Sequence, residues 1–186
     1  TLGPVSAATS DPTDAGAPPN SVKGIIFDLD GVFHVGDQAV PGAAGAIAWA
    51  QKNAIPHLFL TNTFSRPREA IVARLSTFGL SIDVDRILTP AVAATGIRAV
   101  VIGKPAQAFF LTAAHQRGKE PADLLMVGDD IRRDIEGAQR ADLTTAPVRT
   151  GKFNDSDLSL GIRPDAIPAT VADLPRWRKD REEHHR

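Results

Sequence analysis

The sequence predicts an α/β fold in which a doubly wound parallel sheet lies between helices, in a three-layer αβα arrangement. Short apolar runs of strand length alternate with segments of helical periodicity from residue 22 onward. Several of these runs end abruptly in acidic or polar residues, as strands of open α/β sheets do at the edge that faces a ligand. The 186 residues suffice for one domain with a substantial core.

Glycine and proline separate the expected elements in the first half of the chain. Pro41 and Gly42 follow a glycine-rich loop and open the first helix, and Gly79 ends the second helix. The elements expected here are a strand at 22–27, the loop at 31–42, a helix at 43–53, a strand at 56–60, a helix at 66–78 and a short strand at 87–88.

The second half repeats this alternation, and its apolar runs again lead into charged residues. Gly103 and Lys104 follow one expected strand, and Gly128 and Asp129 follow the next. The elements expected here are a short helix at 90–95, a strand at 99–102, helices at 106–116 and 131–140, strands at 124–127 and 144–148, a polar loop at 149–165, a short strand at 166–167 and a helix at 173–183.

Composition narrows the class of protein. Hydrophobic residues make up 42% of the chain and charged residues 23%, which is typical of soluble globular proteins. The formal net charge of −1 gives no basic field to bind nucleic acid, and no apolar run is long enough to span a membrane. The absence of cysteine excludes disulfides, thiolate metal sites and a cysteine nucleophile. We expect a cytoplasmic protein without nucleic-acid or membrane partners.

Three segments are expected. Residues 1–20 contain almost no large apolar side chain and lack the basic start and apolar centre of a secretory signal, so a disordered N-terminal tail is predicted. Residues 21–178 form the α/β core, and residues 179–186 form a charged C-terminal tail.

Chemical groups follow four of the expected strands. Because the carboxyl ends of parallel strands meet at one edge of a sheet, we expect these groups to converge there. They are Asp28 and Asp30, then Thr61, then Lys104, and finally Asp129, Asp130 and Asp134.

This combination of groups suits phosphoryl transfer. Asp28 can attack a phosphorus atom, and Asp30 can carry the proton. Carboxylate oxygens favour Mg²⁺, so Asp28 and Asp129 are expected to bind it directly, with Asp130 or Asp134 in the layer just outside these ligands. Lys104 would offset the negative charge, and Thr61 could donate its hydroxyl to a phosphoryl oxygen.

The chain resembles the haloacid-dehalogenase-like (HAD) phosphatases, whose core is a Rossmann-like sheet. The four motifs of that family occur in order as Asp28-Leu29-Asp30-Gly31-Val32, Leu60-Thr61-Asn62, Gly103-Lys104-Pro105, and Gly128-Asp129-Asp130 with Asp134. Finer features resemble subfamily IIA, which includes p-nitrophenylphosphatases, ribonucleotide monophosphatases and phospholysine phosphohistidine inorganic pyrophosphate phosphatases. These features are Val40-Pro41-Gly42-Ala43, Thr61-Asn62-Thr63, Phe109-Phe110, Gly137-Ala138-Gln139 and Thr150-Gly151-Lys152.

The resemblance implies a role for each matching residue. Asp28 would be the nucleophile that forms an aspartyl-phosphate, and Asp30 would protonate the leaving group and then activate water. Phosphate would be bound by Gly31, Thr61, Asn62 and Lys104. Mg²⁺ would be bound by the carboxylates of Asp28 and Asp129 and the backbone carbonyl of Asp30, with Asp130 and Asp134 orienting its water ligands.

One departure from the subfamily concerns its large cap domain, which lies between the threonine and lysine motifs. Here Thr61 and Lys104 are only 43 positions apart, so the cap is predicted to be missing, with the junction near residues 94–97. The site would then be open, admitting a small phosphorylated substrate or a phosphoprotein, and a surface exposed by the loss could support a homo-oligomer.

Other interpretations remain open at this point. Asp129 and Asp130 could simply cap the helix expected at 131–140, and His34 could either approach a substrate or pack within its loop. A core without its cap could also be catalytically impaired and serve in assembly or as a phosphoacceptor module. In receiver-type modules, however, the acid pair and the phosphoacceptor aspartate lie on different strands, whereas Asp28 and Asp30 share one.

Overall fold

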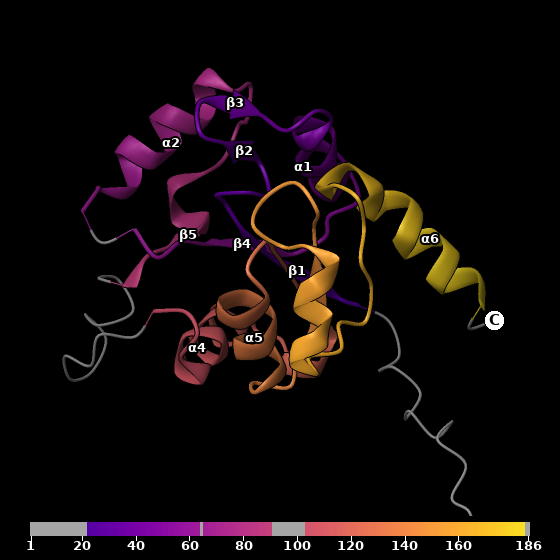
Figure 1. The fold of residues 1–186 in the computed structure, drawn as a ribbon. Coiled ribbons are helices and arrows are strands. Elements are labelled where there is room, and N and C mark those ends of the chain that lie inside the picture. Colours follow the sequence, from indigo (N-terminus) through magenta and orange to yellow (C-terminus); the bar gives the residue numbers. More distant parts are fainter. Residues whose placement is uncertain (1–21, 64, 91–102, 185–186) are drawn as a thin grey trace, which may run out of the picture.

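In the described part of the chain, five parallel strands form the sheet at the centre of the molecule. The structure is a computed structural model that describes residues 22–63, 65–90 and 103–184 (Figure 1). The strand order is β5-β4-β1-β6-β7, so the chain runs outward from the central strand in both directions. The strands are β1 (Gly24–Asp28), β4 (His57–Leu60), β5 (Ile87–Leu88), β6 (Leu124–Gly128) and β7 (Thr144–Pro147).

Helices cover both faces of the sheet, which confirms the predicted doubly wound αβα fold (Figure 1). On one face lie α1 (Ala43–Lys52), α2 (Arg68–Thr77) and α6 (Leu174–His184), and on the other lie α4 (Gln107–Arg117) and the short α5 (Gly137–Gln139).

The sheet separates two hydrophobic cores because alternate residues of each strand point to opposite faces. On β1, Phe27 packs into the core beneath α1 and α2, whereas Ile26 packs into the core beneath α4. Two aromatic residues pack against Phe27 in the first core. The centroid of the Phe27 ring lies 5.2 Å from that of Phe33 and 5.6 Å from that of Phe59. All five residues of β1 are buried, which explains why the strand is continuously apolar up to its last residue, Asp28.

The segment expected as a loop at 31–42 contains a small hairpin. β2 (His34–Val35) and β3 (Gln38–Ala39) pair in antiparallel orientation across a turn that includes Gly36 at a φ of 57°. Strands of two residues are too short to show a periodicity in sequence.

The helix expected at 131–140 is two different helices. A π-helix, η3 (Ile131–Glu136), precedes α5, and the Asp130 carboxylate accepts hydrogen bonds from the first backbone N–H groups of η3. The buried residues of η3 are Ile131, Asp134 and Ile135, and this spacing also fits one face of an α-helix, so the sequence pattern does not reveal the π-helix.

The strand expected at 166–167 is absent from the described residues. The N–H groups of Asp165 and Ala166 both donate to the carbonyl of Thr145, so this segment attaches to β7 at one point instead of forming a ladder. The polar loop before it contains a short 3-10 helix, η4 (Asp155–Leu160). Three further 3-10 turns adjoin other elements: η1 (Val84–Arg86), η2 (Pro121–Asp123) and η5 (Val171–Asp173).

Some expectations concern residues outside the described ranges. These are the N-terminal tail at 1–20, the strand at 99–102, most of the short helix at 90–95 and the cap junction at 94–97. At the other end of the chain, α6 continues to His184 and so includes much of the segment assigned to a charged tail.

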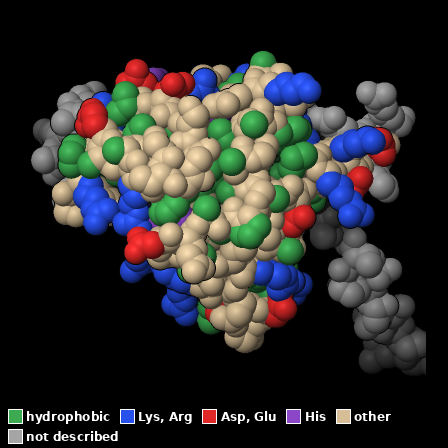
Figure 2. Space-filling model, turned by 90° about the horizontal axis from the view of Figure 1, so that it is seen from above, with side chains coloured by type: hydrophobic (Ala, Val, Ile, Leu, Met, Phe, Trp, Pro, Cys, Tyr) green, Lys and Arg blue, Asp and Glu red, His purple; other side chains and the backbone are tan. Residues whose placement is uncertain are grey.

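The surface on the side of α1 and α2 carries most of its charged side chains around the margin (Figure 2). Large exposed hydrophobic side chains of the described residues are few: Val35 in β2, Leu111 in α4, and Leu158 and Leu160 in η4. In the described part of the chain, every helix is too short or too polar to traverse a bilayer.

Candidate active site

Buried polar side chains meet at the carboxyl ends of the central strands. Asp28 is the last residue of β1, Thr61 follows β4, and Asp129 follows β6. Lys104 and Asp134 complete the group, and all five side chains are buried. The sheet therefore brings together residues that lie far apart in the sequence, as the strand-end pattern predicts.

Lys104 lies between two carboxylates. Its Nζ is 2.7 Å from Oδ1 of Asp28 and 2.6 Å from Oδ1 of Asp134. Burial disfavours the charge on Lys104, but the two carboxylates more than offset this effect and raise the pKa of the ammonium group above its ordinary value. Lys104 therefore stays protonated and places a positive charge at the centre of the cluster.

The surroundings of Asp28 disfavour the ionised form of its carboxyl group. Burial, followed by repulsion from Asp134, raises the pKa of Asp28 to about 8, although Lys104 and the Leu29 N–H favour the ionised form. That N–H donates to Oδ1 of Asp28 over 2.8 Å and fixes the carboxyl group at the strand end. A further cation near Asp28 would stabilise its ionised form.

Asp134 organises the turn that follows β6. Its Oδ2 accepts hydrogen bonds from the backbone N–H groups of Asp129 and Asp130, over 3.1 Å and 3.0 Å. Gly128 allows this approach, because a Cβ atom there would lie 2.3 Å from the Cβ of Asp134. Asp134 thus connects the start of η3 to the end of β6.

The carboxylate of Asp129 has one oxygen held and one unpaired. Oδ2 accepts a hydrogen bond from the Lys152 N–H over 2.9 Å, whereas the buried Oδ1 has no hydrogen-bond partner among the described residues. Burial, above all other effects, raises the pKa of Asp129. An unpaired buried carboxylate oxygen is costly unless a cation binds there.

A cation site fits these residues. One carboxylate oxygen from each of Asp28, Asp129 and Asp134 lies within 4.8 Å of the other two. Hard oxygen donors of this kind are the usual ligands of Mg²⁺. The space around Asp129 is narrow, since a Cβ atom at either Gly31 or Gly151 would lie 2.1 Å from its Oδ2.

Asp130 lies outside this three-carboxylate cluster. Its Oδ1 accepts hydrogen bonds from the N–H groups of Arg132 and Arg133 at the start of η3, which keeps the pKa of Asp130 below its ordinary value despite partial burial. Oδ2 lies 3.6 Å from Nζ of Lys152. The capping role that the sequence left open for Asp130 is therefore observed.

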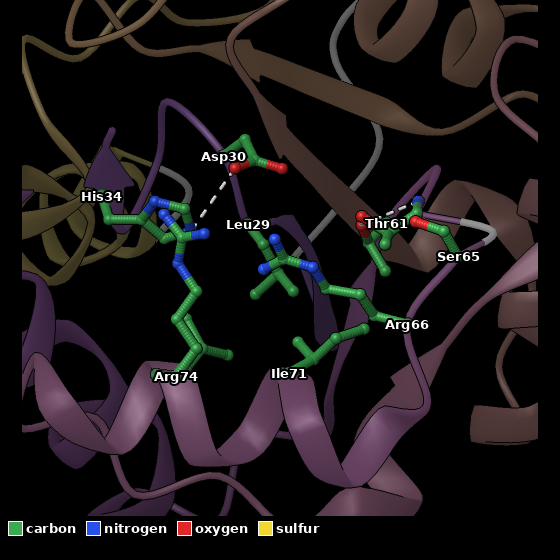
Figure 3. A pocket seen from close by; sticks show the side chains of 10 residues that line it. Leu29, Asp30, His34, Thr61, Ser65, Arg66, Ile71 and Arg74 are labelled. Atoms are coloured by element: carbon green, nitrogen blue, oxygen red, sulfur yellow. Dashed lines mark hydrogen bonds and ion pairs between the residues drawn. The ribbon is translucent and has the colours of Figure 1, made fainter. Parts of the chain in front are cut away.

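The side chain of Asp30 also lies outside the three-carboxylate cluster. It is 69% exposed, and its Oδ1 is 3.5 Å from Nε2 of His34 (Figure 3). The His34 ring is buried against Phe78, with ring centroids 5.1 Å apart, and its Nδ1 lies 3.1 Å from the Gly36 carbonyl. His34 therefore both packs within the hairpin and contacts Asp30.

The side-chain amide of Asn62 forms two hydrogen bonds with the backbone of Lys104. The Lys104 N–H donates to Oδ1 of Asn62 over 2.8 Å, and Nδ2 of Asn62 donates to the Lys104 carbonyl over 3.0 Å. The amide of Asn62, predicted to bind phosphate, is thus used to position the backbone of Lys104.

Thr61 and Gly31, the other predicted phosphate-binding residues, differ in the groups they leave available. The Thr61 hydroxyl lies 3.0 Å from the Thr63 hydroxyl and accepts from the Thr63 N–H. Gly31 has a φ of 76°, and its N–H donates to the His34 carbonyl over 2.8 Å. Gly31 therefore shapes the turn after β1, whereas Thr61 faces the cleft.

A cleft of about 230 Å³ opens above these groups. Its lining also includes three residues that were not among the predicted site residues: Thr63, Arg133 and Lys152. The sequence signal for Lys152 was the segment Thr150-Gly151-Lys152, since Gly151 makes room for Asp129 and the Lys152 N–H binds it. An exposed arginine on a helix, such as Arg133, carries no comparable signal.

Sequence comparisons identify relatives of the chain. The sequence model described as "Haloacid dehalogenase-like hydrolase" matches residues 25–119, and a second HAD-hydrolase-like model matches residues 101–174. The chain is 44% identical over 81 residues to phospholysine phosphohistidine inorganic pyrophosphate phosphatase of Xenopus laevis. The aligned segment makes up 44% of this chain and 30% of that protein. The human protein of the same name gives the same figures. The chain thus matches only about 30% of the length of these relatives.

A longer match is to haloacid dehalogenase-like hydrolase domain-containing protein 2 of Pongo abelii. It is 40% identical over 227 aligned positions, which include 74% of this chain and 88% of that protein. This alignment has more positions than the chain has residues, so the relative contains residues without a counterpart here.

Solved structures share the fold. NagD from E. coli K-12 matches with a TM-score of 0.77 at 19% identity, over 83% of this chain and 98% of that chain. A p-nitrophenyl phosphatase from Archaeoglobus fulgidus matches with a TM-score of 0.73 at 17% identity, over the same shares. Together with the sequence matches and the order of the four motifs, these comparisons show that the chain belongs to the haloacid dehalogenase-like hydrolase family.

Proposed function

We propose that this chain is a Mg²⁺-dependent phosphohydrolase that cleaves phosphate monoesters or related phospho-compounds through an aspartyl-phosphate on Asp28. The observation that carries the proposal is the buried cluster in which Lys104 joins Asp28 to Asp134 beside the unpaired oxygen of Asp129. Such a cluster supplies a nucleophile, a fixed positive charge and donors for a cation, which are the main requirements of phosphoryl transfer.

In the first half of the proposed reaction, an Asp28 oxygen forms a bond to phosphorus while the bond from phosphorus to the leaving oxygen breaks. Asp30 gives its proton to that leaving oxygen. Lys104 and the Thr61 hydroxyl hold the phosphoryl oxygens, because both line the cleft next to Asp28. In the second half, Asp30 takes a proton from water, the water oxygen bonds to phosphorus, and Asp28 and inorganic phosphate are released.

Asp28, Asp129 and Asp134 would hold the cation. A bound Mg²⁺ would neutralise charge on the phosphoryl oxygens and keep Asp28 ionised. Asp130 contributes by capping η3, the helix that carries Asp134 to the cluster. The backbone carbonyl of Asp30 remains a further candidate ligand.

We also propose that the family's cap domain is missing from this chain. The interval of 43 positions between Thr61 and Lys104 and the unmatched residues of the Pongo abelii relative support this proposal. A small phosphorylated compound is the substrate class that the cleft of about 230 Å³ suits best.

The test is hydrolysis of p-nitrophenyl phosphate by the protein and by an Asp28→Asn variant, each with Mg²⁺ and with EDTA. We expect turnover that requires Mg²⁺ and that falls by about 10³-fold or more in the variant, since removing a nucleophile removes the covalent route. The matched control is Asp85→Asn, because Asp85 is exposed and does not line the cleft, and this variant should keep full activity.

Two outcomes would count against the proposal. A folded protein without turnover, or an Asp28→Asn variant with undiminished turnover, would show that Asp28 is not a working nucleophile. A phosphorylated chain that persists long after the substrate is removed would indicate a phosphoacceptor module instead.

A further inference from the structure

A second pocket, of about 310 Å³, adjoins the cleft that opens above Asp28 and Lys104 (Figure 3). The two spaces share three lining residues, Asp30, Thr61 and Thr63, so they lie next to each other. The second pocket extends away from Asp28 toward α2 and the β2–β3 hairpin, where Ile71 and His34 line it.

Positive charge prevails in this pocket. The guanidinium group of Arg66 lies by Leu29, and that of Arg74 lies beside His34 near Asp30 (Figure 3). Asp30 is the one acidic residue that lines the pocket among the described residues. Leu29 and Ile71 supply an apolar floor, so the pocket offers a hydrophobic surface beneath two cations.

The two arginines differ in how they are held. Arg74 donates from Nη2 to the Gly36 carbonyl over 2.9 Å and to Oδ1 of Asp37 over 3.1 Å, which ties α2 to the hairpin. Arg66 is exposed and forms no ion pair with any described residue. Arg66 therefore has its full set of donors available for a ligand.

Asp30 gives the pocket its direction. It borders both spaces, and in the proposed reaction it protonates the leaving oxygen. A leaving group that passes Asp30 from a phosphoryl group on Asp28 enters the second pocket. We propose that this pocket holds the leaving group, and that Arg66 selects substrates whose leaving group carries its own negative charge, either a carboxylate or a second phosphate. This inference rests on the proposed phosphohydrolase function.

The physical reason is charge complementarity at short range. A guanidinium binds a carboxylate or phosphate through charge-assisted, often bidentate hydrogen bonds, which are the stronger hydrogen bonds in proteins. An ammonium-bearing leaving group would meet Arg66 and Arg74 with like charge. A neutral leaving group would gain only the apolar floor.

The test compares three aryl phosphates of similar shape: phenyl phosphate, 3-carboxyphenyl phosphate and 3-(aminomethyl)phenyl phosphate. We expect kcat/KM to be highest for the carboxylate and lowest for the amine. In Arg66→Gln, kcat/KM for the carboxylate should fall about tenfold, as for the loss of one charged hydrogen bond, and that for phenyl phosphate should change less than about twofold. The matched control is Arg68→Gln, because Arg68 begins α2 but faces Asp85 at 4.0 Å and does not line the pocket.

A binding measurement separates this inference from the reaction itself. Calorimetry of the three compounds with Asp28→Asn protein, with and without Arg66→Gln, reports the charge preference without turnover. Equal kcat/KM for the three compounds, or a preference unchanged by Arg66→Gln, would overturn the inference while the phosphohydrolase function stands. Absence of turnover together with Arg66-dependent tighter binding of the carboxylate would overturn the reaction and retain the charge-selective pocket.

Discussion

Lys104 illustrates how much a single residue contributes at this site. Its ammonium group lies within 2.7 Å of carboxylate oxygens from Asp28 and Asp134, and all three side chains are buried. Two buried carboxylates without a cation repel each other and have lost their hydration, so Lys104 is needed for the fold as well as for the phosphate binding proposed above.

We therefore predict that Lys104→Met destabilises the protein by roughly 3–5 kcal/mol, the usual cost of removing one partner of a buried ion pair. Lys23→Met is the control, because Lys23 forms a surface ion pair with Asp123 at 3.0 Å, and its loss should cost about 0–1 kcal/mol. Urea denaturation of both variants measures the difference. Equal midpoints for Lys104→Met and the parent protein would show that the carboxylates find another way to relieve their repulsion.

Residue identity at strand ends predicted much of the site, but it did not predict the direction of every side chain. Asp28 and Asp129 meet as expected because the parallel strands β1 and β6 bring their carboxyl ends together, and Lys104 and Asp134 join them there. Asp130 follows the same strand as Asp129, yet its carboxylate caps η3. An acidic residue before a helix satisfies either role, and only the backbone path decides between them.

At the scale of elements, the turn from β1 into the β2–β3 hairpin depends on Gly31. This residue has a φ of 76°, and a Cβ atom there would lie 2.1 Å from Oδ2 of Asp129. Gly36, in the hairpin itself, also has a positive φ, of 57°, but has nothing within 4 Å of a Cβ position. The two glycines share one backbone requirement and differ in the space around them.

We predict that Gly36→Ala costs about 1–2 kcal/mol, the penalty for a left-handed backbone alone, and that Gly31→Ala costs more. Gly31→Ala should also lower Mg²⁺-dependent turnover, because the new methyl group displaces the Asp129 carboxylate, whereas Gly36→Ala should leave turnover unchanged. Denaturation midpoints and p-nitrophenyl phosphate hydrolysis measure both effects. Gly31→Ala protein with the stability and activity of Gly36→Ala would mean that Asp129 shifts without consequence.

The sequence predicted long elements better than short ones. The strand at 124–127 and the helix at 106–116 were expected within about one residue of β6 and α4, since their apolar residues repeat over several positions. The hairpin and the π-helix η3 were not predicted, because the first is too short to show a period and the second shares the apolar spacing of an α-helix. The hairpin nevertheless matters to the second pocket. It carries His34, which lines the pocket, and its Gly36 carbonyl accepts a hydrogen bond from Arg74, which also lines it.

At the scale of the whole molecule, the sheet must keep one titratable group neutral inside its core. His57 of β4 is buried beside Phe59, with ring centroids 5.7 Å apart. Its Nδ1 lies 2.8 Å from the Ile55 carbonyl, and Nη1 of Arg86 lies 3.3 Å from its Nε2. The neutral ring donates from Nδ1 and accepts at Nε2, whereas a protonated ring would meet the arginine with like charge.

Burial, followed by repulsion from Arg86 and Arg117, lowers the pKa of His57 from its ordinary value of 6.5, although the Ile55 carbonyl and Asp83 favour protonation. Just below pH 6.5, His57 therefore binds a proton in the unfolded chain but not in the folded chain. The contribution of His57 to the free energy of unfolding is fully present above pH 6.5 and is lost as the pH falls from there through the lowered pKa.

We predict that the free energy of unfolding of the wild-type protein falls more between pH 7.5 and pH 5.5 than that of His57→Gln, whose amide does not titrate. The control is His115→Gln, an exposed position on α4, which should follow the wild-type profile. Urea denaturation at a series of pH values measures all three proteins. Because every acidic group is common to them, the difference between wild type and His57→Gln isolates the histidine, and identical pH profiles would show that His57 accepts a proton inside the folded core at no cost.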